Sequence, residues 1–569
     1  MSDTRTGPPG DESDLNDRSA EAPEDTAEET PDVEPIPEPE GPTEVIETDY
    51  EIGQDNYAKS WTLSFDIHQV VFTWSAFAII AFILLTLALQ DEVEPIFTGL
   101  RNWLTGNLDW FFLLSGNIFV ILCLALIVSP LGKIRLGGPE ATPDYGYVGW
   151  FSMLFAAGMG IGLMFFGVSE PLGHFSAAMG GVSVENGVRT DWAPLGGAEG
   201  DVAAAQRLGM AATIFHWGLH PWAIYAVVAL ALALFSYNKG LPLTLRSAFY
   251  PIFGERIWGW PGHIIDILAV FATIFGLATS LGIGAQQAAG GLNHLFGLGT
   301  GDAMLVFLIV FITAIAIASI VRGLDGGVKI LSEVNMGLAA ALLLFIILVG
   351  PTVDILTGFF ANLGAYGQHL PALSMPFARE DANFAQGWTA FYWAWWISWS
   401  PFVGMFIARV SRGRTVREFL IAVLIVPTIL SVLWMTALGG TAISQVVNDG
   451  FTGVQEAALE IQLFEMLSQL PLAAITSVIG ITLVLVFFIT SSDSGSLVID
   501  TIAAGGKINA PVVQRVFWAI VEGMVAIALL LGGGLIALQA MAVSTGLPFT
   551  LVLLAACYAI VRGLMNEPR

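Results

Sequence analysis

The sequence predicts an all-α integral membrane protein with twelve transmembrane helices. Of its 569 residues, 55% are hydrophobic and only 12% are charged, which is too little charge for the surface of a water-soluble protein of this length. Apolar runs of about 20 residues, the length that crosses a bilayer as a helix, recur along nearly the whole chain. Lys and Arg also concentrate in alternate loops between these runs, as in membrane proteins with a fixed orientation.

Twelve apolar stretches qualify as candidate spans. The first two contain few polar residues, and we interpret them as accessory helices. The approximate ranges of the twelve are 68–90, 109–130, 147–169, 208–236, 262–291, 302–321, 335–357, 389–408, 417–440, 472–490, 514–535 and 539–562.

The basic residues set the orientation. If the N-terminus lies inside, the inner loops and the C-terminal end hold fifteen Lys and Arg residues and the outer loops hold four. Three more precede the first span. Because basic residues accumulate on the cytoplasmic side, this ratio predicts that both termini are cytoplasmic.

The N-terminal region differs in composition from the rest. Residues 1–50 hold seventeen acidic and two basic residues and are rich in Pro and Thr. Such a segment cannot bury enough apolar surface to offset its conformational entropy. We therefore expect a disordered acidic cytoplasmic tail over residues 1–58 and a twelve-helix domain over residues 59–569. The tail could bind a basic partner or regulate the domain; a solvated tail without such a role is the plainer interpretation.

Aromatic residues cluster in two of the spans. In the stretch Phe391–Phe402, four residues share one helical face because they lie three and four apart: Tyr392, Trp395, Trp396 and Trp399. The fourth span carries Trp217, Trp222 and Tyr225 around a helix-kinking proline, Pro221. His216 and His220 could share a face there, but a metal site lacks an evident third ligand, so histidines satisfied near a kink are the better interpretation.

The third span contains three glycines at alternate positions, Gly158, Gly160 and Gly162. Small residues in membrane helices often permit close helix packing. Glycines at this density can instead let the backbone unwind at mid-membrane, where transporters bind substrates and ions. The aromatic spans favour the second interpretation.

These stretches suit a quaternary ammonium compound. A trimethylammonium group has no N–H to donate, whereas aromatic faces attract it through their quadrupoles. Residues 147–169, 208–236 and 389–408 contain no Asp, Glu, Lys or Arg, so a pocket there would hold a cation by aromatic faces alone. Tryptophans also form belts at membrane interfaces, but this clustering favours a cage of aromatic rings.

Four segments resemble the signature segments of the betaine/choline/carnitine transporter (BCCT) family: Gly158–Pro171, His216–Tyr225, Tyr392–Phe406 and Ala408–Arg414. The resemblance runs from about residue 60 to the last span. It implies a LeuT-like core of two inverted five-helix repeats, spans 3–7 and 8–12, behind two N-terminal accessory helices. It also implies a homotrimer in a bacterial-type inner (cell) membrane.

The resemblance implies roles for particular residues. The substrate ammonium would lie among Trp217, Trp222, Tyr225 and Trp396. Trp395 and Trp399 would gate the cytoplasmic route, and the substrate would pass an unwound backbone at Gly158, Gly160 and Gly162.

The resemblance also implies sodium coupling. One sodium ion would bind the carbonyls of Ala156, Met159 and Phe487 and the hydroxyls of Thr490 and Ser491. A second would involve Thr273 and Phe402, but Leu277 stands where the family pattern offers another threonine. Proton-coupled members carry an acid within the glycine stretch; Gly162 leaves none here, which favours sodium.

We therefore expect a secondary active transporter, not an enzyme, that imports glycine betaine or a similar quaternary ammonium or sulfonium osmolyte by sodium symport. Dimethylsulfoniopropionate, ectoine, choline and carnitine are alternative substrates on the same fold. A membrane osmosensor or regulator is the alternative from a different class. We expect no cofactor besides the coupling sodium ion, and no nucleic-acid partner.

Overall fold

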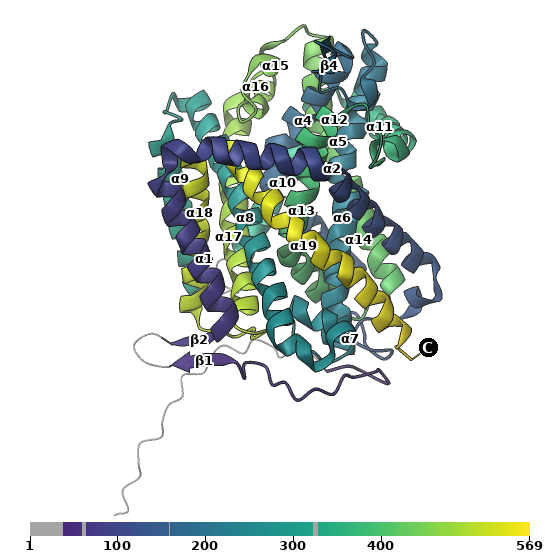
Figure 1. Cartoon of the computed structure of the whole chain (residues 1–569). Coiled ribbons are helices and arrows are strands. Elements are labelled where there is room, and N and C mark those ends of the chain that lie inside the picture. Colours follow the sequence, from purple (N-terminus) through teal and green to yellow (C-terminus); the bar gives the residue numbers. More distant parts are fainter. Residues whose placement is uncertain (1–37, 60–63, 159, 323–327, 569) are drawn as a thin grey trace, which may run out of the picture. The chain divides into compact units, whose positions relative to one another are not determined.

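The computed structural model describes residues 38–59, 64–158, 160–322 and 328–568, which are almost entirely helical (Figure 1). The strands form two short antiparallel hairpins: β1 (Asn56–Lys59) with β2 (Phe65–His68), and β3 (Val184–Glu185) with β4 (Val188–Arg189). The α-helices are α1 (Gln69–Ala88), α2 (Gln90–Val128), α3 (Tyr147–Gly158), α4 (Ile161–Gly180), α5 (Val202–Trp217), α6 (Leu219–Ala233), α7 (Tyr250–Phe253), α8 (Trp260–Phe296), α9 (Asp302–Arg322), α10 (Val328–Val349), α11 (Thr352–Leu373), α12 (Ala382–Phe384), α13 (Ala390–Val410), α14 (Val416–Val447), α15 (Gly453–Glu456), α16 (Gln462–Ser468), α17 (Ala473–Ala503), α18 (Val512–Leu531) and α19 (Gly534–Met565). The short 3-10 and π-helical turns are η1 (Pro130–Lys133), η2 (Pro194–Gly196), η3 (Leu234–Asn238), η4 (Leu245–Phe249), η5 (Gly254–Trp258) and η6 (Ala385–Thr389).

The helices have the length and composition of membrane spans. Within the described ranges, ten helical segments are long and apolar enough to cross a bilayer. Large apolar side chains on α1 face outward, among them Trp74, Phe77 and Leu84. Such an outer surface suits lipid rather than water. The prediction of an all-α integral membrane protein is therefore confirmed at this level. The ten segments are α1, Glu92–Val128, Val202–Asn238, α8, α9, Ile330–Val349, α14, α17, α18 and α19.

Two of the predicted spans are not among these ten. The predicted span 147–169 is divided into α3 and α4, and Gly160 at the start of α4 is fully extended, with φ −165° and ψ −178°. The predicted span 389–408 is α13, whose many Trp and Tyr residues lower its hydropathy because each ring carries a polar group. Most side chains of α4 and α13 are buried, so both helices lie inside the bundle.

The chain also contains a helix that the sequence pattern did not predict. The span expected at 335–357 ends earlier, since α10 stops at Val349 and α11 follows at once. Tyr366 of α11 is buried, and its hydroxyl accepts a hydrogen bond from the Leu219 amide at 3.2 Å. That amide lies just beyond Gly218, where the chain passes from α5 to α6. The kink expected from Pro221 therefore takes the form of a break three residues earlier, supported by α11.

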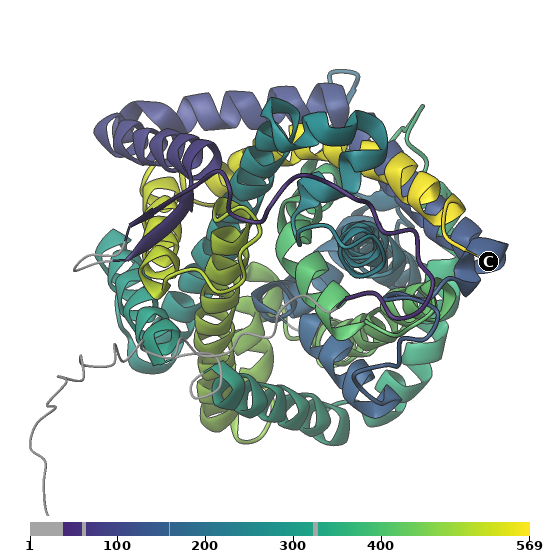
Figure 2. The same cartoon turned by 90° about the horizontal axis from the view of Figure 1, so that it is seen from below.

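The residues that precede the first span are partly ordered. We expected a disordered tail through residue 58; residues 1–37 lie outside the described ranges, but residues 38–58 instead run along the lower face of the helical domain (Figures 1 and 2). Glu44 pairs with Lys239 at 3.1 Å, and the ring of Tyr50 stacks on Trp258 at 4.3 Å. Acidic residues of this segment find basic partners here, which composition alone does not reveal.

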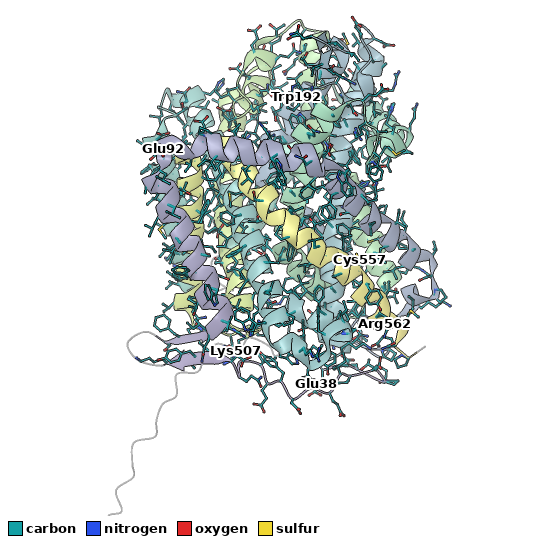
Figure 3. All side chains as sticks on the ribbon, viewed as in Figure 1. Glu38, Glu92, Trp192, Lys507, Cys557 and Arg562 are labelled. Atoms are coloured by element: carbon teal, nitrogen blue, oxygen red, sulfur yellow. The ribbon has the colours of Figure 1, made fainter. Side chains whose placement is uncertain are left out.

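Loops assigned to the same side of the membrane meet in the structure. At one end, Lys239 pairs with Glu567 at 2.5 Å. At the other end, the Asn383 side chain donates to the Arg189 carbonyl at 2.9 Å. Figure 3 shows labelled residues of the first end, Lys507 and Arg562, low in the view and Trp192 of the other end high in it. The domain thus has two polar ends with apolar helices between them.

Candidate functional site

The site begins at the break between α3 and α4. A Cβ atom at Gly162 would lie 2.7 Å from Cη2 of Trp217 and 3.1 Å from Cη2 of Trp395. Only a residue without a side chain lets two indole rings approach the start of α4 this closely. The backbone amides of the first turn of a helix also lack intrahelical partners, so the start of α4 offers free N–H donors.

A small cavity of about 40 Å³ lies at this break. Its walls are aromatic rings, helix backbone and two serines, with no Asp, Glu, Lys or Arg among the lining residues. The lining residues are Ala157, Gly160, Gly162, Leu163, Trp217, Pro221, Trp222, Tyr225, Ser280, Trp395, Trp396, Trp399 and Ser431.

Four of the lining rings form the aromatic cage, which we define as Trp217, Trp222, Tyr225 and Trp396. Trp396 lies at its centre, with ring centroids 4.9 Å from Trp217 and 6.3 Å from Tyr225, both edge to face. Trp222 meets Tyr225 edge to face at 5.3 Å. The indole N–H of Trp396 donates to the His216 carbonyl at 2.9 Å, which fixes its ring. The structure thus brings together the residues expected around the ammonium.

Trp395 and Trp399 lie beside the cage. Trp395 stacks on Trp396 at 4.8 Å with an interplanar angle of 15°. The indole N–H of Trp399 donates to the Gly276 carbonyl of α8 at 2.9 Å. Trp399 and Ala157 line both this cavity and a second one of about 220 Å³. Trp399 is therefore part of the wall between the two cavities.

The second cavity contains most of the residues expected around the first sodium ion. Ala156, Phe487, Thr490 and Ser491 all line it, while Met159 lies outside the described residues. The Thr490 hydroxyl donates to the Val486 carbonyl at 3.0 Å, which leaves lone pairs of its oxygen available. The lining residues thus come from two helices, α3 and α17, as a shared ion would require.

The residues expected around a second sodium ion are less well placed. The Thr273 hydroxyl donates to the Ala269 carbonyl of its own helix at 2.7 Å. Thr273 lines neither of the two cavities, whereas Phe402 lines the second one. Leu277 fills space against α17, since a Cβ at Gly495 would lie 2.3 Å from its Cδ1. Thr273 and Phe402 thus do not share either of these two cavities, and the second sodium site stays a prediction.

Glu170 of α4 is a site residue that the sequence pattern did not single out. Its side chain is fully buried and accepts hydrogen bonds from Trp217 and Tyr392, each at 2.6 Å. It lies one residue beyond the stretch 147–169 in which we looked for charged groups. The available signal was an acidic residue within an otherwise apolar helix, which is costly enough in a membrane to indicate a role.

Glu170 also approaches two histidines. Ligand atoms of Glu170, His174 and His216 lie within 4.8 Å of one another, close enough to consider a metal ion. However, the His216 ring bonds to Glu170 at 2.6 Å and to the Thr389 hydroxyl at 2.9 Å, so its nitrogens already have partners. His220 bonds instead to Asn117 at 2.9 Å. The cluster is better explained as a hydrogen-bond network, and His216 and His220 do not form a joint site.

The fold and cavity define a class of protein: a helical bundle of membrane-span length and composition with a small aromatic-walled cavity at a broken helix. The comparisons identify the family. The family model described as BCCT, betaine/carnitine/choline family transporter, matches residues 70–569, and the chain belongs to this family of membrane transporters.

Several similar proteins are named for the osmolytes that they transport. A glycine betaine/proline/choline transporter of Vibrio parahaemolyticus is 68% identical over 535 residues, covering 94% of this chain and 97% of the relative. Glycine betaine transporter 1 of the same organism is 55% identical, covering 91% and 97%. The glycine betaine transporter OpuD of Bacillus subtilis is 42% identical, covering 84% and 91%.

Proposed function

We propose that this protein imports glycine betaine, or a similar quaternary ammonium or sulfonium osmolyte, by sodium symport. The observation that carries the proposal is the aromatic cage beside the broken helix, in a cavity without charged lining residues. An onium group has no N–H or O–H to offer, so ring faces are its natural partners, each contact contributing about 0.5–2 kcal/mol.

The start of α4 suits the other end of such a molecule. Glycine betaine is a zwitterion, and its carboxylate needs hydrogen-bond donors. The free amides at the start of α4, together with the positive end of the helix dipole, supply them within the same cavity. The cage and the helix start therefore match opposite ends of one small zwitterion.

The names of relatives support a range of substrates. Those quoted above name glycine betaine, proline and choline, and another Vibrio parahaemolyticus relative, 54% identical, is named for ectoine as well. Dimethylsulfoniopropionate and carnitine carry the same kind of cationic head. We place glycine betaine first because every one of these names includes it.

Sodium is the proposed coupling ion. Ala156, Thr490 and Ser491 line one cavity next to the proposed substrate site, and their carbonyl and hydroxyl oxygens are the kind of ligand that sodium binds. A symporter requires that the ion favour the substrate-binding conformation, since a ligand shifts an equilibrium only by its differential affinity. Binding at the α3–α17 boundary would bias the position of the broken helix in this way.

The proposal includes the arrangement in the membrane. We propose twelve crossings, counting α3 with α4 as one and α13 as another, which would put both termini on the same side of the cell membrane. The distribution of Lys and Arg favours the cytoplasmic side. We further propose the two inverted five-helix repeats and the homotrimer that the family resemblance implies. Size-exclusion chromatography with light scattering tests the trimer.

The direct test is uptake of labelled glycine betaine into proteoliposomes. Sodium and proton gradients are imposed separately, with choline, proline, ectoine and dimethylsulfoniopropionate as competitors. We expect uptake that depends on the sodium gradient. Uptake driven by protons in the absence of sodium would contradict the coupling.

Cage variants test the site. Trp396→Ala and Trp222→Leu remove ring faces from the cavity and should raise the half-saturation concentration by about ten-fold or more, as loss of a desolvated cation–π contact predicts. Trp74→Leu is the control, because Trp74 is 53% exposed on the outer face of α1. Unchanged uptake in both cage variants would contradict the proposal that the aromatic cage binds the substrate.

A further inference from the structure

Within the described part of the chain, Glu170 is the acidic side chain that bonds directly to the wall of the cage. It lies on α4, eight residues beyond Gly162, and is fully buried. Its Oε1 accepts from His216 at 2.6 Å and pairs with His174 at 3.2 Å. Its Oε2 accepts from the Trp217 indole N–H and the Tyr392 hydroxyl, each at 2.6 Å. Both carboxylate oxygens therefore carry two partners.

These bonds fix the rings around the substrate. Trp217 is held at both ends, by Glu170 at its Nε1 and by the close approach of Gly162 at its Cη2. Tyr392 does not line the cavity, but it stacks on Trp396 at 5.7 Å and on His216 at 4.7 Å. His216 in turn accepts the Trp396 indole N–H at its carbonyl. Through these contacts Glu170 orients two of the four cage rings.

The carboxylate also lacks a fixed positive partner. Among the described residues, its ion pairs within 4 Å are to His174 and His216 and to no Lys or Arg. The field of a buried charge is weakly screened, so it extends through the Trp217 ring into the cavity. A hydrogen bond from an indole N–H to a carboxylate further polarises the donor and enriches its ring face in electrons.

We propose that Glu170 is a positioning residue of the substrate site, which orients Trp217 and Tyr392 and provides the fixed negative charge that favours a cation in the aromatic cage. This inference rests on the proposed function, since it concerns the same site. Glu170 does not touch the cavity, and it acts through the rings that do.

Two substitutions separate charge from shape. Glu170→Gln keeps the length and one acceptor oxygen but removes the charge; a neutral His216 can accept from the new amide by changing its tautomer and donating to Thr389. Glu170→Asp keeps the charge and shortens the side chain. We expect Gln to raise the half-saturation concentration for glycine betaine by about ten-fold with little change in maximal rate, as loss of a charge-assisted network predicts. Asp should restore part of the affinity.

The control is Glu522→Gln, which neutralises another fully buried acid, on α18, whose side chain accepts from Ser492 rather than from a cage residue. It should leave the half-saturation concentration unchanged. A second readout is inhibition of uptake by choline, a net cation, compared with glycine betaine, which is net neutral. Loss of a fixed negative charge should weaken choline more.

The outcomes distinguish the two proposals. Absence of uptake by the wild type, or uptake unaffected by Trp396→Ala, would defeat the proposed function itself. Normal wild-type uptake with unchanged half-saturation in Glu170→Gln would defeat only the role of Glu170. A fall in maximal rate or protein yield in both Glu170 variants, with affinity unaltered, would mean a purely structural residue and would also overturn the proposal.

Discussion

Gly162 determines how closely two indole rings approach the broken helix. Gly162→Ala would bring a methyl group to 2.7 Å from Cη2 of Trp217, and that ring cannot yield easily because Glu170 holds its other end. We expect the half-saturation concentration for glycine betaine to rise by about ten-fold or more, since overpacking costs typically about 1–3 kcal/mol. Equilibrium binding of labelled substrate measures it.

Gly173→Ala is the matched control. Gly173 lies on the same helix and is exposed, and no heavy atom lies within 4 Å of the position that a methyl group would take there. Its substitution should leave binding unchanged. Equal losses in the two variants would indicate a general effect on α4 rather than crowding of the cage.

At this scale, residue type and spacing predicted two aromatic clusters, because large aromatic side chains without charged neighbours form an unusual local pattern. The family resemblance then selected Trp217, Trp222, Tyr225 and Trp396, and the structure brings these four to one cavity. Glu170 could not be placed in the same way. Its contacts outside its own helix come from side chains 46 to 222 positions away, and such partners are set by tertiary packing rather than by local pattern.

Among the elements, α17 is the proposed source of sodium ligands. Thr490→Val removes a hydroxyl of a residue that lines the second cavity while retaining side-chain volume. We expect the sodium concentration for half-maximal uptake to rise by about ten-fold, which corresponds to about 1.4 kcal/mol of lost ion binding. Uptake measured against external sodium tests this.

Thr482→Val provides the comparison on the same helix. The Thr482 hydroxyl donates to the Val478 carbonyl at 2.8 Å and lies outside both cavities. Sodium dependence should be normal in this variant. An equal rise in the half-maximal sodium concentration in both variants would indicate a general disturbance of α17 rather than the loss of an ion ligand.

The β1–β2 hairpin should loosen in acid. Burial lowers the pKa of His68 from 6.5 to about 3, with Arg246 and His263 adding to the effect and Asp55 lying 3.9 Å away. Because the folded-state pKa is depressed, the stability from the neutral ring is complete above pH 6.5 and declines as the pH falls toward 3. Proteolysis of the segment 38–59 should therefore be faster at about pH 5 than at about pH 7.5, with the increase beginning below pH 6.5.

His68→Asn should remove most of this pH dependence. The His68 ring accepts from the Val71 amide at the start of α1, and asparagine also serves in that position. A wild-type digestion rate that does not change with pH would contradict the assignment.

The long apolar spans were predictable because hydrophobic length is a local property. The break at Gly160 and helix α11 were less so. The break depends on rings brought in from α5 and α13, and α11 mixes polar and apolar residues in a way that also suits a loop. Ion pairs such as Glu44–Lys239 were likewise not predictable, because their partners are far apart in sequence and meet only in the folded chain.

At the scale of the whole molecule, the two polar ends should face opposite compartments. Glu185 in β3 and Glu51 near β1 are both exposed, at different ends of the domain. A cysteine at position 185 should react with a membrane-impermeant maleimide in intact cells, and one at position 51 only after permeabilisation. The native Cys123 and Cys557 are buried, so background labelling should be low.

The reverse labelling pattern would mean that the predicted orientation in the membrane is wrong. Labelling of both positions in intact cells would mean that the two polar ends of the domain do not lie on opposite sides of the membrane. The distribution of Lys and Arg was enough to predict the grouping of loops, because that rule depends on composition near the span ends. It could not predict which loops touch, which depends on how the helices pack.

Trp399 and Ala157 line both the cavity at the aromatic cage and the larger cavity beside it. For the proposed sodium coupling, this shared wall has an electrical consequence. Shortening the Trp399 side chain would merge the two cavities. A sodium ion could then cross the protein without a bound substrate. The defect would be a leak, measurable as sodium current in the absence of substrate, even where uptake at saturating substrate remains high.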